Sequence, residues 1–397
     1  MRKIVNVRDV LVMAATGAVL SLASCNKNIP DPVPNTFPTQ TGTSIGDVVN
    51  TNPNFTFLKA AVVRAGLLPA LSDNSRTYTV FAPDNAAFIA SGVPSETVIN
   101  SLPLTQLVPL LQYHVVPQKV MSTQIPATFP NLQYPSLLNP APTLSALLRL
   151  TTFPSTRNGA WVNNIPIKAV NTEASNGVIH TVGAIVSPPS RYLWDRINTD
   201  ANLTYLRAAV LRADSGIATT SSSSLVNILN NIGANLTVFA PRDAEFRATL
   251  TALITQVLVR QGVPLATAQA QATALAATPA VFSNPALFGA LTAQTVRGVV
   301  VYHVFTNRAF TNNFPTTATN YPTVLNSVVP THPGLGLTAT FTPPNPFAAT
   351  ATVKGLVNAT AANIFINNAP EPNGTSDQHY LNGVLHVINQ VLLPQPL

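Results

Sequence analysis

Four histidines set in apolar runs are the side chains whose type could do chemistry. They are His114, His180, His303 and His386. Near neutral pH an imidazole can serve as a general base, a metal ligand or a charge switch. A histidine flanked by valine and isoleucine is more often a buried ring that hydrogen-bonds to backbone. We favour this structural interpretation for all four.

Residue types for other chemistry are scarce in the chain. A zinc site needs three or four converging ligands, and only Asp377 and His379 lie near His386. The 397 residues include 14 carboxylates and a single cysteine. No G-x-S-x-G motif occurs, and the G-x-G at 334–336 lacks the third glycine of a dinucleotide site. We therefore expect no metal, no cofactor and no enzymatic activity.

The histidines belong to landmarks that occur twice in the same order. The pairs are F-L-K-A-A-V-V-R-A at 57–65 with Y-L-R-A-A-V-L-R-A at 205–213, T-V-F-A-P at 79–83 and again at 237–241, Tyr113-His114 with Tyr302-His303, and N-G-V-I-H at 176–180 with N-G-V-L-H at 382–386. Landmarks matched in order indicate a duplicated domain. The second copy is longer by about 10 residues near 221–224, about 31 between Phe246 and Tyr302, and about 17 before Asn382, and insertions usually fall in surface connections.

Helices and short strands are predicted to alternate in each copy. Residues 57–65 carry the apolar spacing of an amphipathic helix, and 104–113 have a helical period that leads into a strand at 114–116. The run 78–82 is β-branched and aromatic, which indicates a strand. Residues 161–180 and 364–386 predict short strands. Helices on a small antiparallel sheet system predict an α+β domain in each copy.

Two local features refine these elements. Asp84 follows the first T-V-F-A-P and is placed to cap a helix that carries Phe88. In the second copy Arg242 replaces this aspartate and Asp243 follows it, so we expect the helix start to shift. Asparagine pairs at 163–164 and 367–368 are predicted to form matching turns.

The N-terminal residues have the pattern of a signal peptide. Residues 1–9 are basic, and 10–19 are apolar but too short to span a membrane. The sequence L-A-S-C at 22–25 resembles the bacterial lipobox, in which the cysteine is lipidated. We expect residues 1–24 to be a lipoprotein signal peptide and Cys25 to carry a lipid anchor to the membrane. With no second cysteine, no disulfide can form within the chain.

Proline spacing predicts the domain boundaries. Four prolines in residues 26–43 indicate an extended tether, at ~3 Å per residue, so 25–43 would separate the anchor from the first domain. The first domain is expected at 44–188 and the second at 190–397. Pro188-Pro189 between them should restrict their relative orientation. Asn26 after the cysteine is not acidic, which favours the outer membrane, facing the periplasm or the cell exterior.

Charge argues against a nucleic-acid partner. The formal net charge is +7, but only 9% of the residues are charged and no Lys/Arg cluster occurs after the leader. Nucleic-acid binding surfaces usually show such clusters. A mildly basic surface is the simpler interpretation.

The repeated landmarks closely resemble the fasciclin-like domain family. T-V-F-A-P with the following helix is similar to its first signature segment, and N-G-V-I-H and N-G-V-L-H are similar to its second. The Tyr113-His114 and Tyr302-His303 pairs resemble the motif between them. The resemblance implies a wedge of two small β-sheets flanked by helices, and adhesion or matrix binding outside the cell. Tandem copies after a lipobox resemble bacterial surface lipoproteins of this family.

From these features we expect a cell-envelope adhesion or interaction lipoprotein with extracellular protein or polysaccharide ligands. The alternative is an accessory outer-membrane lipoprotein that captures glycans or nutrients beside a transporter; an enzyme would need an unrecognised site. Binding should involve the enlarged second copy. Residues 265–277 are either a partner-binding helix or part of a surface helical hairpin. Residues 321–347, with Phe341 and Phe347, are either an aromatic platform or an ordered loop packed on its own domain.

Overall fold

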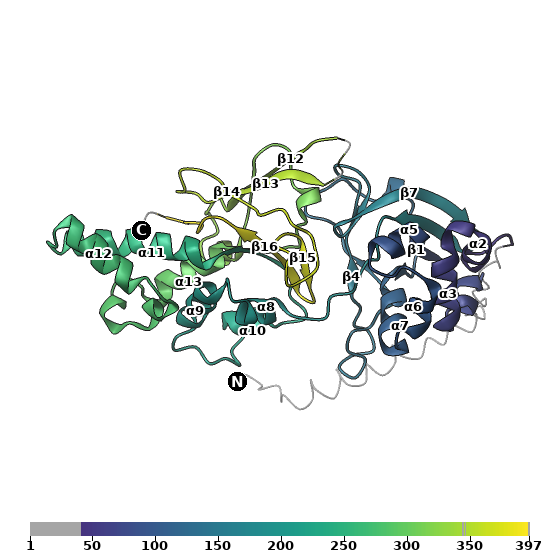
Figure 1. Ribbon diagram of the computed structural model, residues 1–397, viewed down its shortest axis with the longest axis horizontal. Coiled ribbons are helices and arrows are strands. Elements are labelled where there is room, and N and C mark those ends of the chain that lie inside the picture. The colour runs from purple at the N-terminus through teal and green to yellow at the C-terminus, as the bar shows by residue number, and fades with distance from the viewer. Residues whose placement is uncertain (1–40, 344, 346, 396–397) are drawn as a thin grey trace, which may run out of the picture. The chain divides into compact units, whose positions relative to one another are not determined.

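The computed structural model describes residues 41–343, 345 and 347–395, which belong to one compact unit, Gln40–Leu397 (Figure 1). The predicted signal peptide, Cys25 and nearly all of the proposed tether lie outside the described residues. Among the described residues, no helix is both long enough and apolar enough to cross a membrane.

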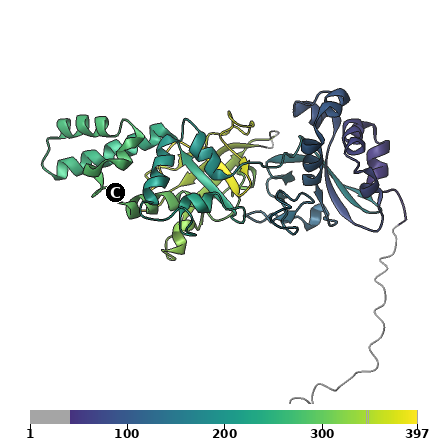
Figure 2. The ribbon, with the colours of Figure 1, turned by 90° about the horizontal axis from the view of Figure 1, so that it is seen from below.

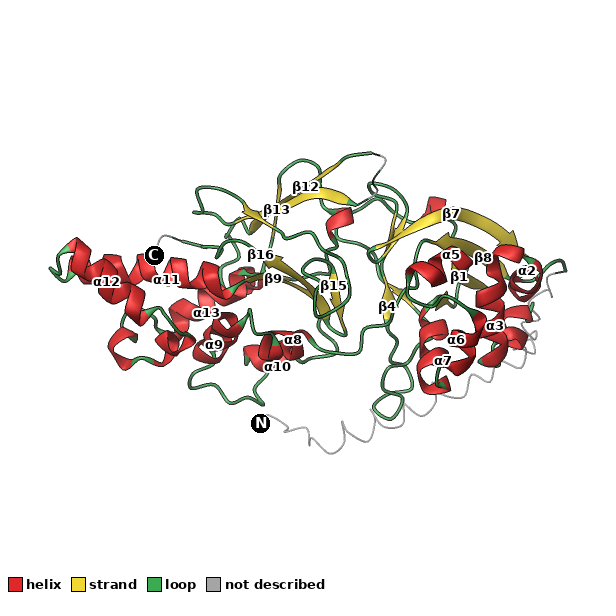
Figure 3. Cartoon of the chain, in the orientation of Figure 1, coloured by secondary structure: helices red, strands yellow, loops and turns green. Residues whose placement is uncertain are grey.

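The chain forms two repeats of mixed helices and small sheets, as the sequence predicts (Figure 3). The elements of the first repeat are α2 (Ile45–Thr51), η1 (Pro53–Phe55), α3 (Thr56–Arg64), α4 (Leu68–Ser72), β1 (Tyr78–Pro83), α5 (Asn85–Ala90), α6 (Glu96–Ser101), α7 (Leu104–Tyr113), β2 (Val115–Val116), η2 (Ser122–Gln124), β3 (Tyr134–Pro135), β4 (Thr151–Thr152), β5 (Pro154–Ser155), β6 (Trp161–Val162), β7 (Ile165–Ala174) and β8 (Gly177–Val182). The elements of the second repeat are α8 (Leu193–Thr199), α9 (Thr204–Ala213), α10 (Leu225–Leu229), β9 (Leu236–Pro241), α11 (Asp243–Arg260), α12 (Leu265–Leu275), η3 (Pro279–Ser283), η4 (Pro285–Leu287), α13 (Ala293–Tyr302), β10 (Val304–Phe305), η5 (Thr311–Asn313), β11 (Thr319–Tyr321), η6 (Val324–Ser327), β12 (Leu335–Phe341), β13 (Ala348–Lys354), β14 (Ala362–Asn363), β15 (Gln378–Tyr380) and β16 (Gly383–Ile388).

The repeated landmarks form the centre of each main sheet. T-V-F-A-P lies in β1 and β9, and the Gly-to-His part of the last landmark starts β8 and β16. These strands pair in the same register, with Phe81 beside His180 and Phe239 beside His386. The sheet orders are β2-β1-β8-β7-β6-β5 in the first repeat and β10-β9-β16-β15 in the second, with separate sheets β3-β4 and β11-β12-β13-β14.

The central pair is parallel in both repeats, which corrects the expectation of an antiparallel system. Parallel strands need a long crossover, and here most of each repeat lies between the two strands. A sequence pattern of short strands does not reveal this direction. Gly177 begins the returning strand with φ 151°, and a Cβ there would lie 1.9 Å from the Tyr78 carbonyl oxygen, so glycine is required at this position.

The predicted shift of the second helix start is wrong. Asp84 caps α5 by accepting from the Ala87 N–H at 2.7 Å, whereas Arg242 provides no side-chain cap to α11. Nevertheless α11 begins at Asp243, the counterpart of the first residue of α5. The Asp243 carboxylate accepts from the Tyr205 N–H at 3.0 Å, as Asn85 accepts from Phe57 at 3.0 Å. The same tertiary contact is thus made by the first helical residue in both repeats.

The turn prediction holds for the first repeat alone. Asn163 and Asn164 connect β6 to β7, with Asn163 at φ 53°. Asn367 and Asn368 instead lie in a loop with no strand directly after them, so the matching turn is wrong. The Asn367 side chain holds this longer loop through the Ala369 N–H at 3.1 Å and the Asn373 carbonyl at 3.0 Å.

The insertions of the second repeat are ordered. The helices α11 and α12 pack on each other as a hairpin (Figure 2), with Ala268 and Ala272 of α12 buried. Residues 321–347 include η6 and β12, and they do not form an isolated loop. Phe347 packs its ring on Trp161 of the first repeat, with centroids 5.4 Å apart, so it is not a free aromatic platform.

Candidate functional site between the repeats

His180 and His386 each bond two other backbone segments in the same way. Each ring accepts a backbone N–H at Nδ1, from Asn171 at 3.3 Å and from Asp377 at 3.1 Å. Because Nδ1 accepts, Nε2 carries the hydrogen and donates to the Val120 carbonyl at 2.9 Å and to the Ala309 carbonyl at 2.8 Å. Both nitrogens of each ring are therefore engaged by backbone.

His114 and His303 make a second matched pair with the opposite tautomer. Nε2 accepts from the Val186 N–H in the first repeat and the Leu392 N–H in the second, both at 2.9 Å. Nδ1 then donates to a carbonyl one helical turn earlier, that of Leu110 or Val299, at 2.8 Å. These rings tie the end of α7 or α13 to the chain that follows the last strand of the repeat.

Burial disfavours protonation of all four rings. It lowers the pKa of His114 and of His303 to about 4, although the bond to a backbone carbonyl opposes the effect. The pKa values of His180 and His386 are also lowered, chiefly by burial. The rings are thus neutral near pH 7 and have no nitrogen free for a ligand or a proton transfer.

Tyr113 and Tyr302 are also held by backbone and amide groups. The Tyr113 hydroxyl donates to the Thr151 carbonyl at 2.9 Å and accepts from Asn163 at 3.2 Å. The Tyr302 hydroxyl donates to the Gly334 carbonyl at 2.7 Å and accepts from the Leu356 N–H at 2.9 Å. Burial raises the pKa of each phenol to about 12, so both stay protonated.

The structure brings together a different group of residues, which the sequence did not indicate. Residues 308–314 of the second repeat, which we call the joining segment, are all buried. Asn313 accepts from the Ser155 hydroxyl at 2.8 Å and also bonds to Asn131. Asn312 donates to the Asn163 carbonyl at 3.0 Å, and Asn158 donates to the Asn312 carbonyl at 3.0 Å. Hydrogen bonds from both repeats therefore cross one buried surface.

Aromatic rings complete this surface. Phe129 of the first repeat stacks on Phe305 with centroids 5.9 Å apart and meets Tyr321 edge-on at 4.7 Å. Phe153 packs beside Phe310 at 6.0 Å, within a small apolar cluster shared with Val384. Such pairs add to the free energy of association beyond the area that they bury.

Arg308 is a buried cation at the centre of the joint. Its guanidinium donates to the Tyr380 carbonyl at 2.9 Å, the Leu381 carbonyl at 2.6 Å and the Asn235 side chain at 2.8 Å. It lies 5.0 Å over the Phe153 ring of the first repeat. Burial lowers the pKa of Arg308 to about 10, so it remains charged at neutral pH.

Above the joint lies a cleft of about 350 Å³ whose walls come from both repeats. The first repeat contributes the turn between β6 and β7, and the second contributes β15 and the loop before it. Pro188 and Pro189 of the connection form part of the wall. The predicted proline-locked joint is thus one side of this cleft.

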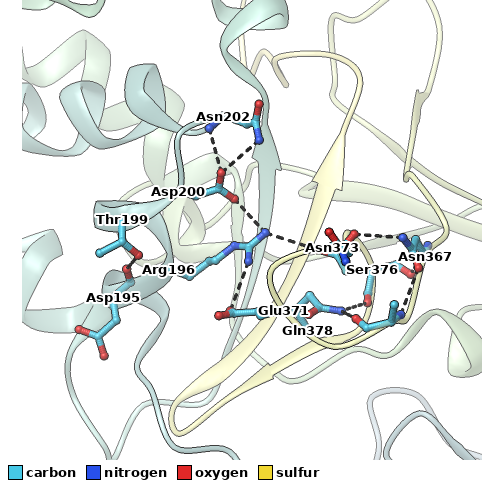
Figure 4. Close-up of polar contacts among 12 residues, drawn as sticks. Asp195, Arg196, Thr199, Asp200, Asn202, Asn367, Glu371, Asn373, Ser376 and Gln378 are labelled. Carbon is cyan, nitrogen blue, oxygen red and sulfur yellow. Dashed lines mark hydrogen bonds and ion pairs between the residues drawn. The ribbon is translucent and has the colours of Figure 1, made fainter.

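The charged groups at the second-repeat side of the cleft are paired with one another. Arg196 binds Asp200 at 2.8 Å and Glu371 at 3.5 Å (Figure 4). Glu371 also binds Arg191 at 2.6 Å and the Tyr380 hydroxyl. Burial, together with the bond to the Glu371 carboxylate, raises the pKa of Tyr380. The network stabilises the loop and leaves little net charge.

Asp377, His379 and His386, which the sequence places near one another, do not assemble into a metal site. His386 Nδ1 lies 4.0 Å from Asp377, but Asp377 accepts from the Thr311 N–H at 2.7 Å and His379 faces Arg308. Within the described part of the chain, no group of three or more His, Cys, Asp or Glu side chains is placed to hold a metal ion.

The residues missed from sequence are those of the joining segment and their partners. A comparison of the two copies contains the signal. Where the second copy reads R-A-F-T-N-N-F at 308–314, the first reads K-V-M-S-T-Q-I at 119–125. The phenylalanines and asparagines that the second copy alone has in this segment mark its buried surface. The histidines are the same in both copies and therefore give no such signal.

Comparisons with known proteins identify the family. The Fasciclin domain model matches residues 53–188. Protein sll1483 of Synechocystis sp. is 36% identical over 155 residues, which are 38% of this chain and 77% of that protein. Transforming growth factor-beta-induced protein ig-h3 of Sus scrofa is 31% identical over 149 residues, 37% of this chain but 20% of that protein.

A solved structure of a FAS1 domain pair, from the insect cell adhesion molecule Fasciclin I, also matches. It is 13% identical with a TM-score of 0.32, over 85% of this chain and 95% of that one. Together with the duplicated landmarks and the two sheets of equal register, the family match leads to one conclusion. The chain belongs to the fasciclin domain family and contains two tandem fasciclin-like domains.

Proposed function

We propose that this protein is a non-catalytic interaction protein, anchored to the cell envelope through lipid on Cys25, that binds extracellular protein or polysaccharide ligands. The observation that carries the proposal is that the motif residues shared by both repeats are buried and bonded to the protein's own backbone. Ligand binding is therefore assigned to surface residues and not to these motif residues.

The α11–α12 hairpin is the proposed macromolecular binding surface. Where the second repeat has the 18-residue α11, the first has only the six-residue α5. The exposed side of the hairpin includes Val259 and Leu265, which are 42% and 59% exposed. Deleting the hairpin would not test this, because Phe246, Leu250 and Ile254 of α11 lie in the core of the second repeat. Surface substitutions leave that core intact.

The test compares adhesion of cells that display the full protein with adhesion of cells that display the Val259→Ser/Leu265→Ser variant. We expect at least a tenfold loss of attachment to ligand-coated surfaces. The matched control is Leu104→Ser in the first repeat, where the side chain is 50% exposed. Equal attachment of all three would refute the hairpin as the binding surface.

The anchor is tested separately. We propose an outer-membrane location with the domains at 44–188 and 190–397 beyond a tether at 25–43. Cys25→Ser should release the protein from the membrane fraction. Protease shaving of intact cells should remove the domains if they face the exterior. A membrane-bound Cys25→Ser variant would contradict the lipid anchor.

A second proposed function, capture of glycans or nutrients beside a transporter, is favoured by one observation. The cleft between the repeats has the size of a small-molecule site, about 350 Å³. Its chemistry is developed in the next subsection.

A further inference from the structure

We propose that the cleft between the repeats binds a neutral saccharide, with both repeats supplying hydrogen-bonding groups. The inference rests on the second proposed function and names its site and ligand class. Small-molecule sites occur preferentially at domain interfaces, and pockets of roughly 300–1,000 Å³ are typical of them. The cleft, at about 350 Å³, would hold one or two sugar rings.

The charges of the cleft argue against an ionic ligand. Glu371 is bound by Arg191 and Arg196, and Arg196 is also bound by Asp200. Two guanidinium groups thus face two carboxylates. Asp377 is satisfied by the Thr311 N–H and hydroxyl, at 2.7 and 2.6 Å. A charged ligand would have to displace one of these internal partners, whereas a neutral ligand would not.

Neutral polar groups, by contrast, are available in the walls. The amides of Asn164 and Asn368 and the hydroxyl of Ser190 line or border the cleft and form no side-chain hydrogen bond to another described residue. An amide offers both a donor and an acceptor, which is what a sugar hydroxyl needs. Asn164 comes from the first repeat and Asn368 from the second.

His379 contributes a donor of known identity. Its Nε2 faces the Arg308 guanidinium, which has donors only, so Nε2 must accept and the neutral ring carries its hydrogen on Nδ1. Nδ1 is bonded to no other described residue, and His379 lines the cleft. The buried cation at the joint therefore holds the tautomer that presents an N–H.

An apolar wall suits the other face of a sugar. Ile165 and Ile185 of the first repeat and Pro188 and Pro189 of the connection also line the cleft. The C–H face of a pyranose ring is apolar and packs on such side chains, while its hydroxyls point outward to the amides. The wall and the amides together define a ligand with one apolar and one hydroxylated side.

The experiment is calorimetric titration of the soluble chain without its leader, using glucose, maltose, cellobiose and N-acetylglucosamine, with galacturonate as the anionic comparison. We expect a neutral sugar to bind with Kd of about 1 mM or tighter and galacturonate to bind no better. Asn164→Ala and Asn368→Ala should each weaken binding about threefold to tenfold, and the double variant more. Asn54→Ala, an exposed asparagine outside the cleft, should bind as the unsubstituted protein does.

The outcomes separate the site from the function. If a neutral sugar still binds to the double variant, the cleft is refuted as the binding site, but glycan capture at another site is not. Absence of binding by every sugar refutes both the cleft and the second function. Preferential binding of galacturonate refutes the neutral class. Thermal unfolding of each variant verifies that the two asparagine substitutions leave the fold intact.

Discussion

The segment after the Tyr-His strand has opposite environments in the two repeats. In the first, Lys119 is exposed and forms a surface ion pair with Glu173 at 2.8 Å. In the second, the strand registers place Arg308 at the position of Lys119 and His379 at that of Glu173. There the cation is buried, and backbone carbonyls replace the carboxylate as its main partners.

The difference shows how one edge of a duplicated domain becomes a joint. A buried cation is costly unless its donors are satisfied, and a planar guanidinium satisfies several fixed acceptors at once. Arg308 reaches its three acceptors from three different nitrogens, whereas all the donors of a lysine lie on one nitrogen. The surrounding change to phenylalanine and asparagine supplies apolar area and cross-repeat hydrogen bonds.

The largest expected difference is between substitutions at these two equivalent positions. Arg308→Ala should lower the free energy of unfolding by about 3–5 kcal/mol, because it leaves buried carbonyls without donors and opens a cavity. Lys119→Ala should cost less than about 1 kcal/mol, as for exposed ion pairs. Urea titration of both variants measures this. Equal losses would mean that the two positions do not differ in burial as described.

Acid should affect the repeats alike, because the histidine contacts are the same in both. The pKa of His114 and of His303 is lowered to about 4, so below pH 6.5 the unfolded chain binds protons that the folded chain does not. The contribution of each neutral ring to stability is therefore fully present above about pH 6.5. It is lost as the pH falls towards 4, by on the order of 3 kcal/mol per ring.

Urea titration at pH 7, 5.5 and 4 measures this loss of the free energy of unfolding. In His114→Gln and His303→Gln variants, which are less stable at pH 7, the slope of stability against pH should decrease by the same amount. A slope that changes in one repeat alone would break the equivalence of the two rings.

A smaller effect is expected at Asn313 and its counterpart Gln124. Asn313→Ala removes the cross-repeat bonds to Ser155 and Asn131 and should cost about 1–2 kcal/mol. Among the described residues, the Gln124 side chain bonds only to the nearby Met121 N–H, so Gln124→Ala should cost about 0.5 kcal/mol or less. Thermal unfolding of the pair measures the difference. A larger loss at Gln124 would contradict the assigned interface.

Local sequence signals predicted the elements well where local physics decides them. The β-branched T-V-F-A-P run, the helical period of 104–113 and the Asp84 cap all appear as expected. The parallel pairing of β1 with β8 depends on contacts about a hundred residues apart in sequence, which no local pattern encodes. At the start of α11, Asp243 accepts from the Tyr205 N–H, again a partner that no local pattern indicates.

The candidate site was harder to predict than the fold. The six tyrosines and histidines of the motifs were visible because they repeat, and repetition selects what both copies need for folding. The roles of Arg308 and the cleft amides were not visible, because a basic residue occurs at the equivalent position of both copies and the asparagines were matched as turn residues. The burial of segments from both repeats at one joint reveals these roles.

The parallel central pair has a consequence for synthesis. In each domain the last strand, β8 or β16, lies in the middle of its main sheet, between strands that precede it in the chain. While a domain emerges from the ribosome, its sheet therefore lacks a central member until the final residues are made. Each domain should therefore stay unfolded until its chain is nearly complete, and an unfinished domain exposes apolar surface and unpaired strand edges during synthesis.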